Sequence, residues 1–268
     1  MVSERVLKRR RRQAAGRSAM YGLLALVAVA LIFFADWGKI GSNFFKPDVA
    51  RDMLPEVLTN AARNTLVYTA AAFAFGFFFA LLLALMKLSS IAPYRWFATA
   101  YIELFRGLPA LITILLVGFG VPIAFGWTIP FGTLGKGTIG LGIVAAAYMA
   151  ETIRAGIQAV PHGQTEAARS LGMTPGTAML YITLPQAFRI IIPPLTNELV
   201  LLIKDTSLFF VLGSTPTSKE LTKFARDFMT ESRNATPLIV VSIVYLIITL
   251  PLTYLVRRLE SKAAQEKR

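Results

Sequence analysis

The chain has 268 residues, of which 55% are hydrophobic, and a mean hydropathy of +0.58. This composition excludes a soluble globular protein of ordinary type. The formal net charge is +13, but the basic residues lie beside apolar runs and form no single basic domain, which favours membrane topology over nucleic-acid binding. No cysteine is present, and the single histidine, His162, cannot form a histidine metal site by itself, so the sequence predicts no metal centre.

The N-terminal segment, residues 1–18, contains seven Lys and Arg residues and precedes an apolar run, 19–35, that predicts a transmembrane helix. A cleavable signal peptide is the alternative. The run is long for a signal core and no small-x-small cleavage site precedes Asp36, so we favour a retained first helix. Residues 36–60 contain prolines, glycines and charges, which predicts an outer loop with a short interfacial helix.

Five further apolar runs are long enough to cross a bilayer: 62–86, 97–121, 138–158, 190–212 and 237–257. The run 97–121 is apolar mainly from Leu108 onward, which predicts an interfacial helix that enters the membrane near Gly107. The run 138–158 is rich in Gly and Ala, which allows neighbouring helices to approach closely. Strand-period alternation is nowhere sustained. The prediction is an all-α integral membrane protein with six transmembrane helices.

The distribution of Lys and Arg predicts the orientation of these helices. With six spans, both termini lie on one side, and the segments on that side contain eighteen Lys and Arg residues. The segments on the opposite side contain nine, and Lys204 lies within a span. Cytoplasmic loops are enriched in basic residues, so the sequence predicts cytoplasmic termini.

The outer segment 213–236 has apolar residues at helical spacing, namely Leu221, Phe224, Phe228 and Met229. This spacing predicts a helix that lies on the membrane surface. Reception of a soluble binding protein is the alternative.

The polar segment, residues 161–185, separates two apolar runs on the cytoplasmic side. We expect a first helix over 162–171 that stops at Gly172, which can adopt the left-handed conformation. Thr174 is expected to cap a second helix with Pro175 at its first position, and Pro185 to end that helix or kink its continuation. Two such helices suit docking into the groove of a partner, and an ordinary loop between helices is the alternative.

A sequence motif within the polar segment resembles that of a known family. Glu166, Ala167 and Ala168 are followed at fixed spacing by Gly172, Ile182 and Leu184-Pro185. This pattern resembles the EAA loop of the membrane subunits of binding-protein-dependent ABC importers. The segments 105–109, 152–161 and 204–208 are similar to permeases of the polar amino-acid uptake family, and the resemblance covers roughly residues 55–257. The chain departs from the usual pattern at Leu108, where the family often has Thr, and at Asp205, where it often has Asn or Ser.

The resemblance implies a five-helix type I importer core, residues 61–257, after an N-terminal part, 1–60, and before a cytoplasmic tail, 258–268. It implies that the loop 161–189 couples the permease to two cytoplasmic ATPase subunits. The other implied partners are a second permease subunit, identical or related, and an extracytoplasmic amino-acid-binding protein. The coupling contact would involve Glu166, Ala167, Ala168, Gly172, Leu184 and Pro185.

Nucleotide chemistry is not expected in this chain. The phosphate-binding pattern G-x-x-x-x-G-K-[ST] is absent from the sequence. We therefore expect no cofactor here and assign ATP and Mg²⁺ to the partner ATPase, which makes this chain a transport subunit and not an enzyme.

Polar residues inside the predicted spans are the candidates for a substrate path, because they are costly in a membrane. Lys204 and Asp205 lie past the midpoint of the fifth span and offer a cation and an acceptor to a zwitterionic substrate. Pairing with residues of other helices is the alternative. Glu151 and Arg154 are three residues apart and favour an intrahelical ion pair, and Asn197 and Glu198 are candidates for exposure to a cavity. The candidate path comprises Lys204, Asp205, Thr206, Ser207, Glu151 and Asn197.

The favoured interpretation is a permease subunit of an ATP-driven, binding-protein-dependent importer for a polar amino acid, in the cell membrane of a prokaryote. Alternating access would be its mechanism. The alternative is a secondary transporter driven by an ion gradient, with Lys204, Asp205 and Glu151 as the relay. A membrane scaffold without transport activity is a third reading.

Overall fold

The computed structural model describes the backbone of residues 2–265 and the side chains of residues 16–27 and 29–261. The described residues form helices and no β-strand, as expected. The chain divides into two compact units, Met1–Lys46 and Pro47–Arg268. In the first unit, α1 (Val2–Phe34) contains the predicted first span, and α2 (Trp37–Phe44) begins after Asp36, whose carboxylate accepts a hydrogen bond of 3.0 Å from the amide of Lys39.

The second unit begins with α3 (Pro47–Glu56), which continues through a π-helical turn, η1 (Val57–Ala62), into α4 (Arg63–Leu88). The sequence predicted an outer loop with a short interfacial helix over 36–60. Most of this segment is instead helical, and α3 joins α4 without a break because the π-turn accommodates the change in register.

The third predicted span is broken. It consists of α5 (Ala92–Gly107), α6 (Ala110–Leu115), a π-turn η2 (Leu116–Gly120) and α7 (Val121–Phe125). The helices bend by 106° at the break, where Leu108 is extended before Pro109. A residue before proline is disfavoured in the helical region, so the chain turns at this point, next to the position near Gly107 where the sequence predicted that the helix enters the membrane.

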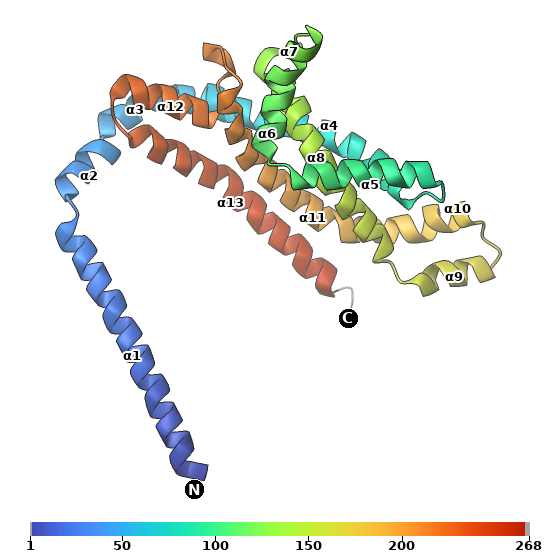
Figure 1. Cartoon of the computed structure of the whole chain (residues 1–268), viewed down its shortest axis with the longest axis horizontal. Helices are drawn as coiled ribbons and strands as arrows, with labels where there is room; N and C mark the ends of the chain where they lie inside the picture. Colours follow the sequence, from blue (N-terminus) through green and yellow to red (C-terminus); the bar gives the residue numbers. More distant parts are fainter. Residues whose placement is uncertain (1, 266–268) are drawn as a thin grey trace. The chain divides into compact units, whose positions relative to one another are not determined.

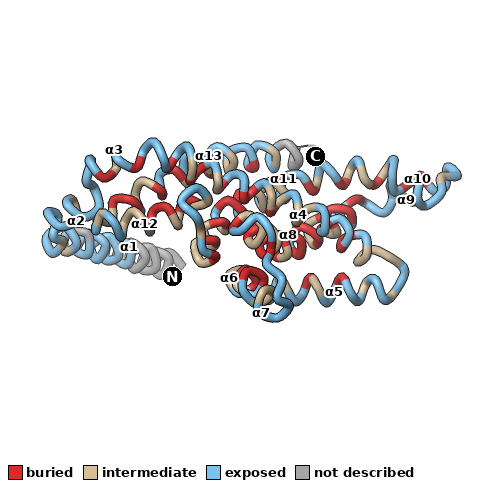
Figure 2. Tube along the Cα trace, turned by 90° about the horizontal axis from the view of Figure 1, so that it is seen from above, coloured by how far each residue is buried: buried red, intermediate tan, exposed pale blue. Residues whose placement is uncertain are grey.

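The long helix α8 (Gly132–Gln158) lies at the centre of the second unit and contains many of its buried residues (Figure 2). It packs closely on α4. A Cβ atom on Gly76 of α4 would lie 3.0 Å from the carbonyl oxygen of Gly142, and one on Gly142 would lie 2.5 Å from the ring of Phe75. The absence of side chains at these two glycines lets the two backbones approach, as the Gly and Ala content predicted.

The remaining helices run between the two ends of this unit (Figure 1). The segment that contains α9 and α10 lies at the end of this unit opposite to α3 and α12 in both overall views. The elements are α9 (His162–Ser170), α10 (Pro175–Ala178), the π-turn η3 (Met179–Thr183), α11 (Leu184–Asp205), the 3-10 turns η4 (Thr206–Val211) and η5 (Pro216–Ser218), α12 (Leu221–Ser232) and α13 (Thr236–Gln265).

The helix predicted for the outer segment 213–236 is α12, but its apolar face packs against other helices of the protein. Leu221 and Phe224 are buried against α3, η1 and α13, where Met53 and Val57 are fully enclosed. An amphipathic pattern does not distinguish lipid from protein as the apolar neighbour, so the sequence expectation was wrong on this point.

By length and composition, five helical stretches of the described residues qualify as membrane spans, and the bent pair α5 and α6–α7 makes up to six. This number agrees with the six spans predicted from hydropathy.

Candidate functional site

The polar segment 161–185 folds as a helix, a tight turn and the start of a second helix. α9 ends at Ser170, and Gly172 has a φ of +88°. The amide of Met173 donates to the carbonyl of Ala168 at 3.2 Å, and the amide of Gly172 donates to that of Arg169 at 3.0 Å. These two bonds form the Schellman motif that closes a helix around a left-handed glycine, as the sequence predicted.

The second helix begins where it was expected, but it is not short. The hydroxyl of Thr174 accepts a hydrogen bond of 3.3 Å from the amide of Thr177, and Pro175 occupies the first turn. α10 then continues through η3 into α11, so the stretch Pro175–Val211 is helical throughout. Pro185 does not end the helix because it lies at the start of α11, directly after the π-turn.

The predicted coupling residues divide by exposure. Glu166, Ala167, Gly172 and Pro185 are exposed, whereas Ala168 is buried and Leu184 is half-buried. The contact between the hydroxyls of Thr165 and Thr183, at 3.3 Å, holds α9 against η3. Leu171 was missed by the sequence reading, although 84% of it is exposed at the turn.

Glu151 joins two helices. Its carboxylate forms ion pairs with Arg154 on α8 and with Lys87 on α4, the latter at 3.0 Å. Arg154 also donates to the side chain of Gln158. The intrahelical pair was predicted from the spacing of three residues, but Lys87 was missed because it lies 64 residues away in the sequence.

A cavity of about 330 Å³ lies where the α5–α6 break meets α8 and α11. Two carboxylates of α11, Glu198 and Asp205, and Tyr148 of α8 provide its polar groups. Glu198 and Asp205 are seven residues apart, which places them on one face of the helix, about two turns apart. The other lining residues are Leu108, Ala110, Leu141, Val144, Ala145, Leu201 and Leu202.

Tyr148 links this cavity to the broken span. Its hydroxyl donates to the carbonyl of Arg106 at 3.4 Å, and the guanidinium of Arg106 lies 5.5 Å from the centre of its ring.

The six residues predicted for the substrate path do not form one cluster. Of the six, Asp205 alone lines the cavity. Glu151 is held by Lys87 and Arg154, and Thr206 is buried with its hydroxyl donating to the carbonyl of Ile203 at 2.6 Å. Lys204 and Asn197 are exposed and Ser207 is half-buried, all outside the cavity wall. Glu198, which the sequence analysis named with Asn197 as a candidate for exposure to a cavity, lies in the wall, as expected.

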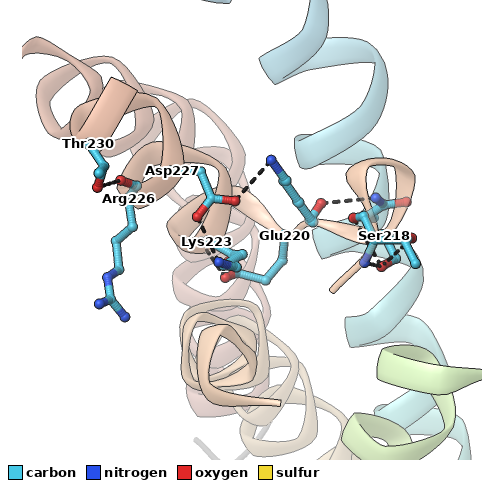
Figure 3. Close-up of polar contacts among 9 residues, drawn as sticks. Ser218, Glu220, Lys223, Arg226, Asp227 and Thr230 are labelled. Atoms are coloured by element: carbon cyan, nitrogen blue, oxygen red, sulfur yellow. Dashed lines mark hydrogen bonds and ion pairs between the residues drawn. The ribbon is translucent and has the colours of Figure 1, made fainter. Parts of the chain in front are cut away.

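A polar cluster lies at the end of the second unit that contains α12 (Figure 3). Glu220, which is 1% exposed, accepts hydrogen bonds from the amides of Thr222 at 2.5 Å and Lys223 at 2.6 Å, and so caps α12. Burial raises the pKa of Glu220 to about 7, against these hydrogen bonds, which lower it. Burial also raises the pKa of Asp227, but hydrogen bonds from Lys223 and Lys219 outweigh this effect and hold its pKa below the usual range.

The segment before Glu220 is tied to α4. The side-chain amide of Asn64 donates to the carbonyls of Thr217 and Lys219, at 2.8 Å and 2.9 Å. The hydroxyl of Tyr68 donates to the carbonyl of Ser218 at 2.7 Å. These contacts join residues about 150 positions apart in the sequence, so no local sequence pattern predicts them.

Comparison with known proteins assigns the chain to a family. Residues 76–265 match the family model described as "Binding-protein-dependent transport system inner membrane component". The probable glutamine ABC transporter permease protein GlnM of Bacillus subtilis (strain 168) is 37% identical over 203 residues, which cover 74% of this chain and 90% of that protein. The arginine transport system permease protein ArtQ of the same organism is 34% identical over 70% of this chain and 83% of its own length.

The fold has a counterpart among solved structures. A crystal structure described as an amino acid ABC transporter with histidines superposes with a TM-score of 0.72 at 38% identity, covering 79% of this chain and 95% of that chain. The family match, residues 76–265, lies within the second compact unit, which contains the cavity and the polar segment. The chain therefore belongs to the family of inner membrane components of binding-protein-dependent transport systems.

Proposed function

We propose that this chain is the membrane-spanning permease subunit of an ATP-driven importer that carries a polar amino acid across the cell membrane of a prokaryote. The observation that carries the proposal is the combination of family membership with a cavity whose polar wall groups are Glu198, Asp205 and Tyr148. Charged groups in a span that face a cavity are suited to a charged solute, and the remainder of the wall is apolar.

The polar segment 161–185 is proposed to dock a cytoplasmic ATPase. Glu166, Ala167 and Gly172 are exposed, and α9, which contains the first two, lies at the end of the second unit opposite to α12 (Figure 1). The two-to-one excess of Lys and Arg on the side of the polar segment supports a cytoplasmic location for it and for both termini. ATP and Mg²⁺ would be bound by the ATPase and not by this chain.

The proposed assembly has two ATPase subunits, a second permease subunit and an extracytoplasmic binding protein that delivers the solute to the end containing α12. Nucleotide-driven closure of the ATPases would move the docked segments and rock the helices between inward-open and outward-open states.

Affinity purification of the tagged chain from its native membranes, followed by identification of the co-purifying proteins, tests the assembly. We expect an ATPase subunit and a permease subunit. The purified complex in proteoliposomes is expected to accumulate radiolabelled amino acids only with ATP on the ATPase side and binding protein on the other.

An ion-driven transporter is the competing function. It requires uptake by the chain alone under a proton or sodium gradient. Such uptake without ATP would refute the proposal, as would labelling of the polar segment from outside intact cells.

A further inference from the structure

The polar cluster beside α12 is centred on a buried carboxylate. Glu220 is 1% exposed, and its carboxylate accepts hydrogen bonds from the amides of Thr222 and Lys223 at the start of α12. The hydroxyl of Tyr245 on α13 donates to the same carboxylate at 3.5 Å. In the part of the chain that the structure describes, no Lys, Arg or His side chain forms an ion pair with Glu220.

The two lysines next to Glu220 bind a different acid. The ammonium nitrogen of Lys219 lies 2.9 Å from the carboxylate of Asp227, and that of Lys223 lies 2.7 Å from it (Figure 3). Lys223 therefore gives its amide to Glu220 and its charge to Asp227. The charge of Glu220 is left without a basic partner to offset the cost of burial.

Two phenols also face Glu220 from neighbouring helices. One is Tyr245 of α13, and the other is Tyr68 of α4, which lies within the electrostatic influence of the carboxylate. Phenols are uncharged near neutral pH, and the ion-paired lysines and Asp227 keep their charges there. Glu220 is the member of this cluster that titrates near neutral pH, because burial raises its pKa to about 7.

Glu220 ends a segment, residues 213–220, that we call the strap. The side-chain amide of Asn64 and the hydroxyl of Tyr68 tie the strap to α4 through its backbone carbonyls. Residues 215–217 of the strap are exposed, so polar contacts hold this part in place. Such contacts exchange readily with water when a segment opens.

The cluster also reaches the end of α11. The hydroxyl of Tyr245 lies 3.3 Å from that of Thr222 and interacts with that of Thr206, which directly follows α11. Thr206 is fully buried, and its hydroxyl also donates to the carbonyl of Ile203 at 2.6 Å. Buried polar groups thus connect Glu220 with the end of α11.

A movement that lifts the strap and admits water to Glu220 changes the affinity of this residue for a proton. Hydration returns its pKa from about 7 toward the usual 4.5, so the open arrangement binds the proton less tightly than the closed one. The closed arrangement is therefore favoured as the pH falls, and the open arrangement is favoured as the pH rises through this range.

We propose that Glu220 is a pH-sensitive switch: the protonated acid holds the strap closed over α4 and α13, and ionisation of the acid favours opening of this end of the protein. The switch goes beyond the proposed function and rests on it in one respect. If the end that contains α12 faces the outside of the cell, the external pH sets how readily that end opens during transport.

Single cysteines report on the strap without interference, because the chain contains no cysteine of its own. Leu221→Cys places a thiol at a fully buried position beside Glu220, and Thr217→Cys places one at an exposed position of the strap. The complete complex in lipid nanodiscs is treated with a water-soluble maleimide at pH values from about 5.5 to about 8, which bracket the pKa of Glu220. The ratio of the two reaction rates cancels the pH dependence of thiol reactivity itself.

We expect the rate for Leu221→Cys, divided by the rate for Thr217→Cys, to rise by at least about tenfold over this range. Each unit of pKa difference between the closed and open arrangements contributes up to about tenfold. Adding Glu220→Gln, which resembles the protonated acid, should leave the ratio low and independent of pH. Glu231→Gln is the matched control, because it removes a carboxylate from an exposed position of α12 and should preserve the rise.

Hydrogen exchange of the wild-type chain provides a second measurement, which stays available if Leu221→Cys does not fold. After correction for the intrinsic pH dependence of exchange, the amides of the strap should exchange at least about tenfold faster at the upper end of the same pH range.

The two proposals fail in different ways. A pH-independent ratio and corrected exchange rate in the wild-type background, or an equal rise with Glu220→Gln, would overturn the switch. Neither result bears on transport, because both measurements use no nucleotide and no solute. Absence of ATP-driven amino-acid uptake by the complex at every pH would instead refute the proposed function.

Discussion

Lys87 near the end of α4 and Glu151 near the end of α8 form an ion pair of 3.0 Å that joins the two most closely packed helices of the second unit. Their side chains are only 18% and 24% exposed, and Arg154 adds a second ion pair to the same carboxylate. The carboxylate of Glu151 is therefore the shared counter-ion of Lys87 and Arg154.

Replacing Glu151 by Gln is expected to destabilise the chain by about 1–3 kcal/mol, because it leaves two partly buried cations without a counter-charge. Thermal unfolding in detergent would show a lower midpoint. The double variant Lys87→Gln/Glu151→Gln should lose less than the sum of the two single losses. Strictly additive losses would indicate that the pair is not coupled.

A second prediction concerns the approach of α4 and α8. Gly76→Ala would place a Cβ 3.0 Å from the carbonyl of Gly142, where backbone cannot move aside cheaply. We expect a loss of about 1–3 kcal/mol, typical of overpacking. Gly120→Ala is the control, since its Cβ would meet Leu116 at an ordinary 3.7 Å. Equal unfolding midpoints for the two variants would contradict the close approach of α4 and α8 at Gly76.

The turn after α9 gives a third prediction. Gly172 has a φ of +88°, where a β-branched residue is strained by about 1–3 kcal/mol. Gly172→Val is expected to disrupt the turn and to reduce co-purification of the ATPase, while the chain still inserts. Gly172→Asn should be milder, because Asn tolerates the left-handed region better. Normal co-purification with Val would exclude a requirement for this turn in docking.

The buried carboxylate of Glu220 predicts a dependence of stability on pH. Its pKa lies near 7 in the folded chain and at its usual 4.5 when unfolded, so the folded chain binds more protons between these values. The free energy of unfolding therefore falls as the pH rises from about 4.5 to about 7. Glu220→Gln removes this contribution, so its unfolding midpoint should fall less between pH 5 and pH 8 than that of the wild type, with both measured in the same detergent. Parallel pH profiles would contradict the assignment.

Local features of the fold could be predicted from the sequence. Apolar runs located the spans because about twenty residues must cross the hydrocarbon core. The change of helix expected near Gly107 coincides with the break before Pro109, and Gly172 and Thr174 marked a helix end and a helix start, since each signal acts within a few residues.

Features that depend on distant parts of the chain could not be predicted. The partner of Glu151 on α4, the ties from Asn64 and Tyr68 to the segment before Glu220, and the shared cavity of Glu198 and Asp205 all require the packing of separate helices. The apolar face of α12 shows the same limit, because hydrophobic spacing specifies burial without naming what covers it.

The helical stretch from Pro175 to Val211 is uninterrupted. Its length therefore fixes both the distance between its two ends and the angle by which side chains at one end are rotated about the helix axis relative to those at the other. An α-helix turns about 100° per residue, so inserting one residue between the proposed docking segment, 161–185, and Glu198 would turn both acidic side chains by about 100° relative to that segment. Inserting seven residues, close to two full turns, would restore the angle and lengthen the rod by about 10 Å. The number of residues in this stretch is thus as closely constrained as their identity.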